Sequence, residues 1–228
     1  MVKNEANEMM TAVDGVYQQM LVKNAIKNRI IDMNEVFNET SCYKLNYFLE
    51  KIERIDDLKN TPMKEREPIT IRINSAGGAV YELFNVLATI ERLQKRGYKI
   101  HTYAGGKVMS CGLILFVSAD KRIVSRFSTL LYHSVSSYTA GKLVPMEEDI
   151  EEVKRLNEFG KEFIKEKTGV DVDEVYKDKT KYSDIFISGK EAFELGLATD
   201  MISRKWYSMA KCKTKKTTTK KKGGSGCK

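Results

Sequence analysis

One unit occurs twice in succession in this chain: a strand, a glycine-rich turn and a helix, over residues 69–97 and again over 98–118. In the first copy, apolar and polar residues alternate along 69–73, and apolar residues recur at helical spacing after Gly77-Gly78. In the second copy, Gly105-Gly106 predict a turn before a short apolar helix. Parallel strands joined through helices place their carboxyl-terminal loops at one edge of a sheet. The chain is therefore predicted to be α/β, with its binding or catalytic loops at that edge.

The other elements are predicted from periodicity and capping residues. They comprise a helix ending near 27, a strand over 28–31, a helix over 38–55, a polar linker over 56–67, strands over 122–124 and 129–132, a polar loop over 134–143, a long helix over 145–167, a helix over 172–176, an extended segment over 185–187 and a helix over 189–195. Gly97 and Gly169 are expected to end the helices before them. These elements form one domain over 28–203, between a partly mobile segment over 1–27 and a tail.

The charge is concentrated in that tail. The formal net charge is +8, and residues 204–228 contribute +10, so residues 1–203 carry about −2. A lysine-rich segment of this composition cannot bury enough apolar surface to fold alone, so the tail is expected to be disordered. Nucleic acid is not an expected partner except through this tail.

No membrane span, metal site or cofactor site is visible in the sequence. The longest purely apolar stretch, Leu113 to Val117, is too short to cross a bilayer. The first residues lack the pattern of a secretory signal, which predicts a cytoplasmic protein. With 4 cysteines and 2 histidines and no paired ligand spacing, neither a metal nor a cofactor is expected.

Ser110 is the candidate nucleophile because it opens the short buried helix. A serine there is ordinarily an N-cap. However, a helix N-terminus also stabilises negative charge, and the amide of Cys111 would lie beside an oxyanion. Cys111 itself is predicted to be a small buried hydrophobe rather than a nucleophile. Val108 occupies the first glycine position of Gly-x-Ser-x-Gly, which disfavours an α/β-hydrolase elbow.

His133 is the candidate general base, since it follows an apolar strand. The only other histidine, His101, lies within a strand nine residues before Ser110 and is worse placed. Asp184 could orient the histidine, but spacing alone does not select it. Four other aspartates compete with it: Asp171, Asp173, Asp178 and Asp200.

Four motifs, in order along the chain, resemble the Clp protease proteolytic subunit (ClpP) family. They are Ile73-Asn74-Ser75-Ala76-Gly77-Gly78, Met109-Ser110-Cys111-Gly112, Tyr132-His133 and Asp184-Ile185-Phe186-Ile187-Ser188. The resemblance covers roughly residues 28–203. It implies a serine peptidase with the ClpP/crotonase-like spiral of repeated ββα units and a projecting handle over about 145–180.

The resemblance also implies roles for individual residues. Ser110 matches the nucleophile, His133 the general base and Asp184 the residue that orients it. The backbone N–H groups of Gly78 and Cys111 match the oxyanion hole. An extended substrate would bind beside residues on both sides of this site: Gly77, Ala79, Ser134 and Val135.

The implied partners are peptide or unfolded protein substrates, a homo-oligomeric ring of this chain and an AAA+ unfoldase. Four positions depart from the family's usual residues. Ala76 replaces a proline, Ser134-Val135 replace Gln-Pro after the histidine, and Ser183 replaces an arginine that helps to link two rings.

Three other functions remain open. A viral ClpP-like protease would trim capsid or scaffold proteins without an unfoldase. A crotonase-type acyl-CoA enzyme would use the oxyanion donors without a serine–histidine–aspartate set. An inactive structural subunit would not react with a serine-directed phosphonate. A serine–lysine pair with Lys107 is unnecessary when His133 is present.

Overall fold

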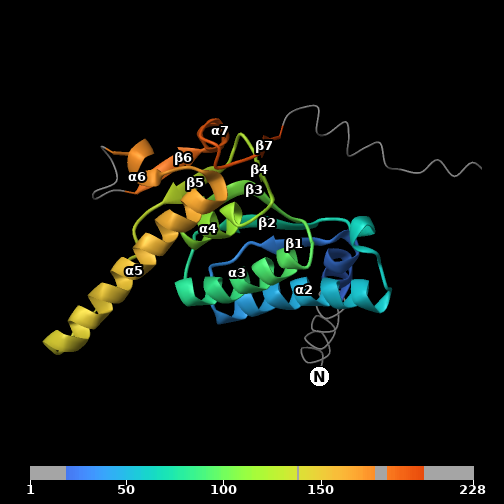
Figure 1. Ribbon diagram of the computed structural model, residues 1–228, viewed down its shortest axis with the longest axis horizontal. Helices are drawn as coiled ribbons and strands as arrows, with labels where there is room; N and C mark the ends of the chain where they lie inside the picture. The colour runs from blue at the N-terminus through green and yellow to red at the C-terminus, as the bar shows by residue number, and fades with distance from the viewer. Residues whose placement is uncertain (1–18, 138, 178–183, 203–228) are drawn as a thin grey trace, which may run out of the picture.

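The computed structural model describes residues 19–137, 139–177 and 184–202, which form a 7-stranded sheet and the helices around it (Figure 1). The strands are β1 (Ile30–Met33), β2 (Ile69–Ser75), β3 (Ile100–Met109), β4 (Lys121–Val124), β5 (Thr129–Tyr132), β6 (Ile185–Ser188) and β7 (Asp200–Met201). The helices are α2 (Glu39–Leu58), α3 (Val80–Lys95), α4 (Cys111–Val117), α5 (Leu143–Thr168), α6 (Val172–Val175) and α7 (Gly189–Glu194). Residues 19–28 are also helical, and Met63–Glu65 form a 3-10 turn.

The sheet is parallel in the order β1-β2-β3-β4-β7, with β3 at its centre. The first part of β3 pairs with β4, and its last residues, 107–109, pair in parallel with β5. β5 also pairs with β6, which is antiparallel to it. The carboxyl ends of β3 and β5 therefore lie side by side at one edge of the sheet.

The predicted turn at Gly105-Gly106 is wrong, because both glycines lie inside β3. They mark the place where β3 changes its partner from β4 to β5 and where its pairing with β2 shifts register. A Cβ on Gly106 would lie only 2.8 Å from Asn74 Oδ1, an atom that accepts a hydrogen bond from the N–H of Lys107. The lack of a side chain at Gly106 therefore lets Asn74 approach the backbone of β3, and no turn is formed.

Smaller differences concern the ends of elements. β1 begins at Ile30 rather than residue 28, and α2 continues to Leu58, which shortens the linker predicted over 56–67. Gly97 and Gly169 follow α3 and α5 with positive φ, as predicted. Most of the segment predicted over 1–27 and the whole tail over 204–228 lie outside the described residues.

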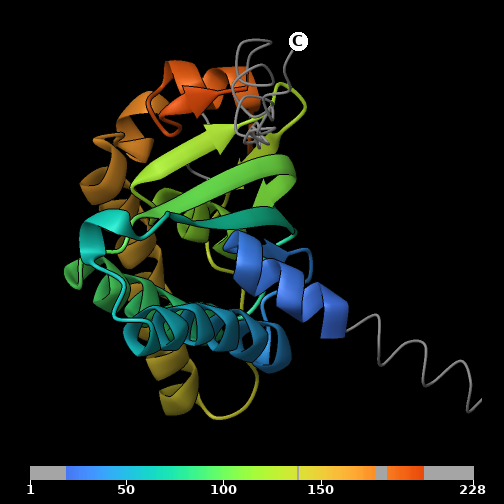
Figure 2. The same ribbon diagram turned by 90° about the vertical axis from the view of Figure 1, so that its right-hand side faces the viewer.

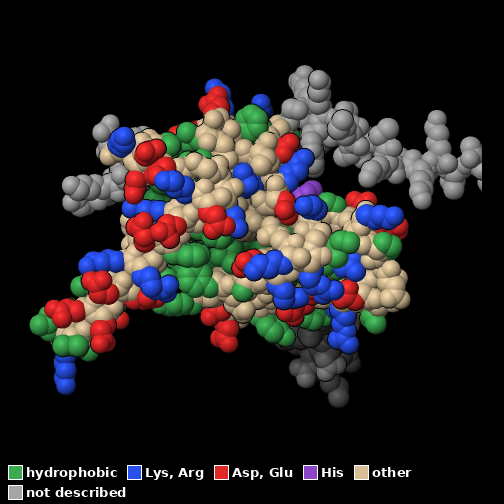
Figure 3. All heavy atoms as spheres, viewed as in Figure 1, with side chains coloured by type: hydrophobic (Ala, Val, Ile, Leu, Met, Phe, Trp, Pro, Cys, Tyr) green, Lys and Arg blue, Asp and Glu red, His purple; other side chains and the backbone are tan. Residues whose placement is uncertain are grey.

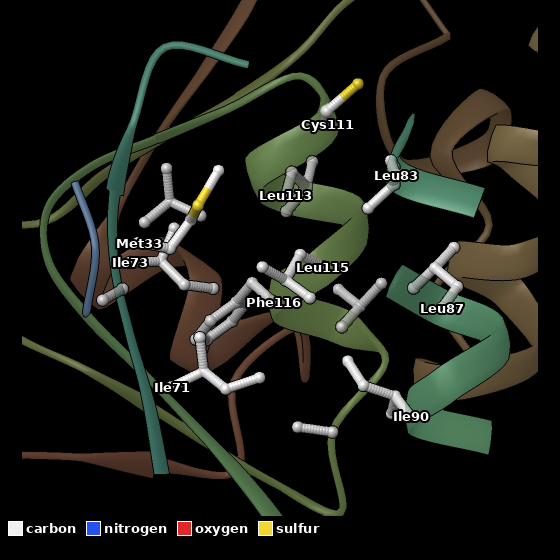
Figure 4. Packing of buried hydrophobic residues seen from close by; sticks show 14 of the residues in the cluster. Met33, Ile71, Ile73, Leu83, Leu87, Ile90, Cys111, Leu113, Leu115 and Phe116 are labelled. Atoms are coloured by element: carbon white, nitrogen blue, oxygen red, sulfur yellow. The ribbon is translucent and has the colours of Figure 1, made fainter. Parts of the chain in front are cut away.

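Helix α4 is buried between the sheet and α3, which explains why its sequence has no polar face. Its side chains Leu113, Leu115 and Phe116 are at most 1% exposed. Figure 4 shows Ile71 of β2 on one side of α4 and Leu87 of α3 on the other. This enclosure fixes the N-terminus of α4, and with it Ser110.

Helix α5 is the projecting helix that the sequence predicts. Figures 1 and 2 show that it begins away from the sheet and runs back to it. Leu143 and Val144 are exposed at its outer end, beside charged side chains of both signs (Figure 3). Nearer the sheet, Phe159 packs edge-on against Phe84 of α3, with 4.7 Å between ring centroids. None of the helices in the described part of the chain is both long and apolar enough to span a membrane.

Candidate functional site

Ser110 occupies a strained turn between β3 and α4. Its φ of 53° and ψ of −120° are unusual for a residue with a Cβ, a conformation that costs about 1–3 kcal/mol. Its N–H donates to the carbonyl of Leu131 in β5 (2.9 Å), and among the described residues its side chain makes no capping hydrogen bond to α4. Ser110 therefore occupies the N-cap position of α4, but its hydroxyl does not cap the helix. The turn is a strained strand-to-helix elbow, although Gly-x-Ser-x-Gly is absent from the sequence.

The β5–β6 pair brings His133 and Asp184 together. Tyr132 lies opposite Ile185 in this antiparallel register, so the residue after β5 meets the residue before β6. His133 Nδ1 lies 3.6 Å from Asp184 Oδ1, and the imidazole side chain is 28% exposed. This distance is longer than that of a hydrogen bond.

The other aspartates that compete in the sequence have different surroundings. Asp171 caps α6 and pairs with Lys165, and Asp173 pairs with Lys161. Asp200 lies in β7, 3.5 Å from Lys121. Asp178 lies outside the described residues.

Ser110 and His133 line the same small pocket, which has a volume of about 50 Å³. Within the described ranges, no hydrogen bond joins the hydroxyl to the imidazole; such bonds commonly tighten only when substrate binds. His101 lies near the N-terminal end of β3, far along the strand from Ser110, and pairs with Thr70 of β2 and Lys121 of β4. Burial, followed by the charge of Lys121, lowers the pKa of His101. The structure therefore brings His133, and not His101, to the pocket beside Ser110.

Two backbone N–H groups are the expected oxyanion donors, those of Gly78 and Cys111; Cys111 follows Ser110 in the chain, and the glycine before Gly78 lies against Ser110. Phe37 donates its N–H to the carbonyl of Gly77 (2.8 Å) and accepts the N–H of Ala79 (2.8 Å). This parallel bridge turns the N–H of Gly78 away from Phe37. The N–H of Cys111, in the first turn of α4, has no acceptor within its own helix. Neither N–H donates to another group in the part of the chain that the structure describes.

The glycine turn lies directly against Ser110. A Cβ on Gly77 would lie 2.6 Å from Ser110 Cβ, and a Cβ on Gly78 would lie 2.3 Å from the carbonyl oxygen of Phe37. Both glycines also have positive φ. Only glycine fits this turn, and Gly77 is the residue of the turn that lies against Ser110.

Cys111 is a buried side chain, as the sequence predicts, with 3% of its surface exposed. Burial raises the pKa of its thiol to about 11, which disfavours the thiolate that a cysteine nucleophile requires. The thiol donates a hydrogen bond to the carbonyl of Gly78 (3.1 Å), which links the glycine turn to the start of α4. No cluster of three or more His, Cys, Asp or Glu residues suited to a metal occurs among the described residues.

The two segments expected to hold substrate lie on either side of the pocket, and both contact α5. Tyr81, just after Ala79, donates its hydroxyl proton to Glu152 (2.5 Å). The N–H of Val135, next to Ser134, donates to Asn157 Oδ1 (2.6 Å). Sequence reasoning missed Glu152 and Asn157, because a helix contact with a distant segment leaves no periodic pattern.

The chain is similar to known proteins over most of its length. The family model described as Clp protease matches residues 15–205. The ATP-dependent Clp protease proteolytic subunit 2 of Parasynechococcus marenigrum (strain WH8102) is 24% identical over 182 residues, covering 79% of this chain and 86% of that protein. The corresponding subunit 2 of Bacillus licheniformis is 25% identical over 174 residues, covering 75% and 85%. Subunit 3 of Rhizobium etli is 27% identical over 139 residues, covering 60% and 69%.

Proposed function

Since the chain belongs to the Clp protease family and is a serine-type peptidase, we propose that it hydrolyses peptide bonds through an acyl-enzyme on Ser110. His133 is the general base in this proposal, and Asp184 orients it. The observation that carries the proposal is the meeting of three strand ends: β3 before Ser110, β5 before His133 and β6 after Asp184. The N–H groups of Gly78 and Cys111 are the oxyanion donors in this proposal, which is supported by the contact of the Gly77–Gly78 turn with Ser110 and by the start of α4 at Cys111.

The proposed chemistry has two balanced stages. The Ser110 oxygen attacks the peptide carbonyl while His133 accepts the hydroxyl proton, and the N–H groups of Gly78 and Cys111 stabilise the oxyanion. The C–N bond then breaks, and the imidazolium gives its proton to the departing amine. Water attacks the acyl ester with His133 again as base, which releases a carboxylate and restores the hydroxyl. The Asp184 carboxylate stabilises the imidazolium in both stages.

The walls of the pocket favour an apolar substrate side chain. Leu83 from α3, Ile114 from α4 and Leu156 from α5 line it beside Ser110. An extended peptide held by main-chain hydrogen bonds to 77–79 and 134–135 would place the residue before the scissile bond here. We therefore propose cleavage after apolar residues.

A change at Gly160 of α5 tests this specificity. Gly160 lines the pocket, and a Cβ there would lie 4.0 Å from Ile114 Cδ1. Gly160→Leu is expected to lower kcat/KM at least about tenfold for peptides cleaved after leucine or methionine, because it fills the pocket, and to spare cleavage after alanine. Kinetics on such a matched peptide series measure the effect. Gly160→Ala is the control and should keep the wild-type preference; an unchanged preference in Gly160→Leu would contradict the pocket assignment.

The names of the relatives extend the proposal to partners. They are called proteolytic subunits of ATP-dependent Clp proteases. By analogy, we propose that the chain is cytoplasmic, forms a homo-oligomeric ring and receives unfolded protein from an ATPase. The exposed apolar end of α5, with Leu143 and Val144, supports an association with other subunits.

A further inference from the structure

Asn157 joins α5 to the segment that follows His133. Its side-chain oxygen accepts the N–H of Val135 at 2.6 Å, in a partly buried setting. Asn157 also lines the pocket that Ser110 and His133 line. Asn157 is thus a polar residue of the pocket wall. The residue that donates to it, Val135, lies two positions after the candidate base His133.

The segment over 133–137 needs such an anchor, because it forms neither helix, strand nor turn. β5 ends at Tyr132, so ladder hydrogen bonds do not hold the backbone beyond it. Successive N–H groups of an extended backbone point in opposite directions. Val135 turns its N–H toward α5, so an extended backbone here would direct the N–H groups of Ser134 and Ser136 away from α5.

The anchor itself is rigid. Leu156, the neighbour of Asn157, is 6% exposed. Phe159 is wedged between Phe84, at 4.7 Å, and Phe163, at 5.5 Å between ring centroids. This part of α5 is therefore packed against the core, and a hydrogen bond from it transmits a fixed position to the segment.

We propose that Asn157 is a positioning residue that fixes the backbone of 134–136 for main-chain pairing with substrate. This role rests on the proposed peptidase function. Asn157 acts through Val135 and does not touch the reacting bond. We therefore expect that removal of the Asn157 side-chain oxygen weakens peptide binding more than it slows the reaction of Ser110 with a small reagent.

Two substitutions separate the hydrogen bond from packing. Asn157→Leu keeps the approximate size and removes the acceptor, whereas Asn157→Asp keeps an oxygen at the same place. The exposed neighbour Glu158, changed to Gln, is the matched control. Asn157→Leu should raise KM for a peptide about tenfold with a smaller change in kcat, as expected for loss of one hydrogen bond, while Asn157→Asp stays within about threefold of wild type.

Two further readouts make the test independent of peptide turnover. Hydrogen exchange of the Val135 amide should accelerate at least about tenfold in Asn157→Leu and remain slow in wild type, Asn157→Asp and Glu158→Gln. In Asn157→Leu, the rate of Ser110 labelling by a small fluorophosphonate should fall much less than kcat/KM for the peptide, because that reagent does not use the 134–136 backbone.

The outcomes distinguish this role from the peptidase proposal. A freely exchanging Val135 amide in wild type overturns the role even if Asn157→Leu does not fold. Equal losses in the Leu and Asp variants, or an unchanged KM in Asn157→Leu, also overturn it. Wild-type protein that neither cleaves peptides nor labels at Ser110 would refute the peptidase proposal, and this role with it.

Discussion

Ser110→Ala is expected to lower kcat/KM for a peptide by about 10⁴- to 10⁶-fold, because removal of the nucleophile leaves only binding and the oxyanion donors. Alanine meets the same backbone strain at a φ of 53°, so the free energy of unfolding should change by less than about 1 kcal/mol. Initial rates and thermal unfolding of the same preparation measure both quantities.

Ser110→Gly sharpens this prediction. Glycine adopts the backbone angles of residue 110 without strain, so this variant should be equally inactive yet more stable than wild type by about 1 kcal/mol. A higher free energy of unfolding together with lost activity in Ser110→Gly would show that the backbone strain at residue 110 accompanies catalysis. A turnover within tenfold of wild type in either variant would remove Ser110 from the mechanism.

Gly78→Ala is expected to impair both folding and catalysis. The new Cβ would lie 2.3 Å from the carbonyl oxygen of Phe37, at a φ of 148° that disfavours side chains. The free energy of unfolding should fall by about 2–5 kcal/mol. If the variant folds, kcat should fall by about 10²- to 10³-fold, because the displaced N–H no longer meets the oxyanion.

Gly141→Ala is the matched control for that variant. Gly141 has a similar φ of 141°, but no atom of the described residues lies within 4 Å of the position that a Cβ would take there. Urea unfolding should therefore show a much smaller loss for Gly141→Ala, which carries the backbone strain without the collision. Equal losses of stability in the two variants would mean that the contact with Phe37 is not what requires glycine at 78.

The sequence could predict what local patterns encode. The alternation in β2 and the helical spacing of α3 and α5 indicated these elements, and Gly97 and Gly169 marked two helix ends. Ser110 and His133 stood out because a nucleophile needs a base and the chain has 2 histidines. Membership in the Clp protease family, first visible as a resemblance, is confirmed by the match over 15–205.

Long-range pairing accounts for what the sequence could not predict. Asp184 became distinct from the other aspartates only through the antiparallel register of β5 and β6. Gly105-Gly106 looked like a turn because a change of strand partner has no local signature. Asn157 is one polar residue of a long helix, and its contact with Val135 depends on how that helix packs. The assigned roles of Ser110, His133 and Asp184 stay predictions until measured.

Mass-spectrometric labelling with a fluorophosphonate tests the central claim most directly. We expect a single adduct, on Ser110, in wild type and in the control His101→Gln, and none in Ser110→Ala or His133→Ala. An adduct on another residue, or undiminished labelling of Ser110 in His133→Ala, would contradict it.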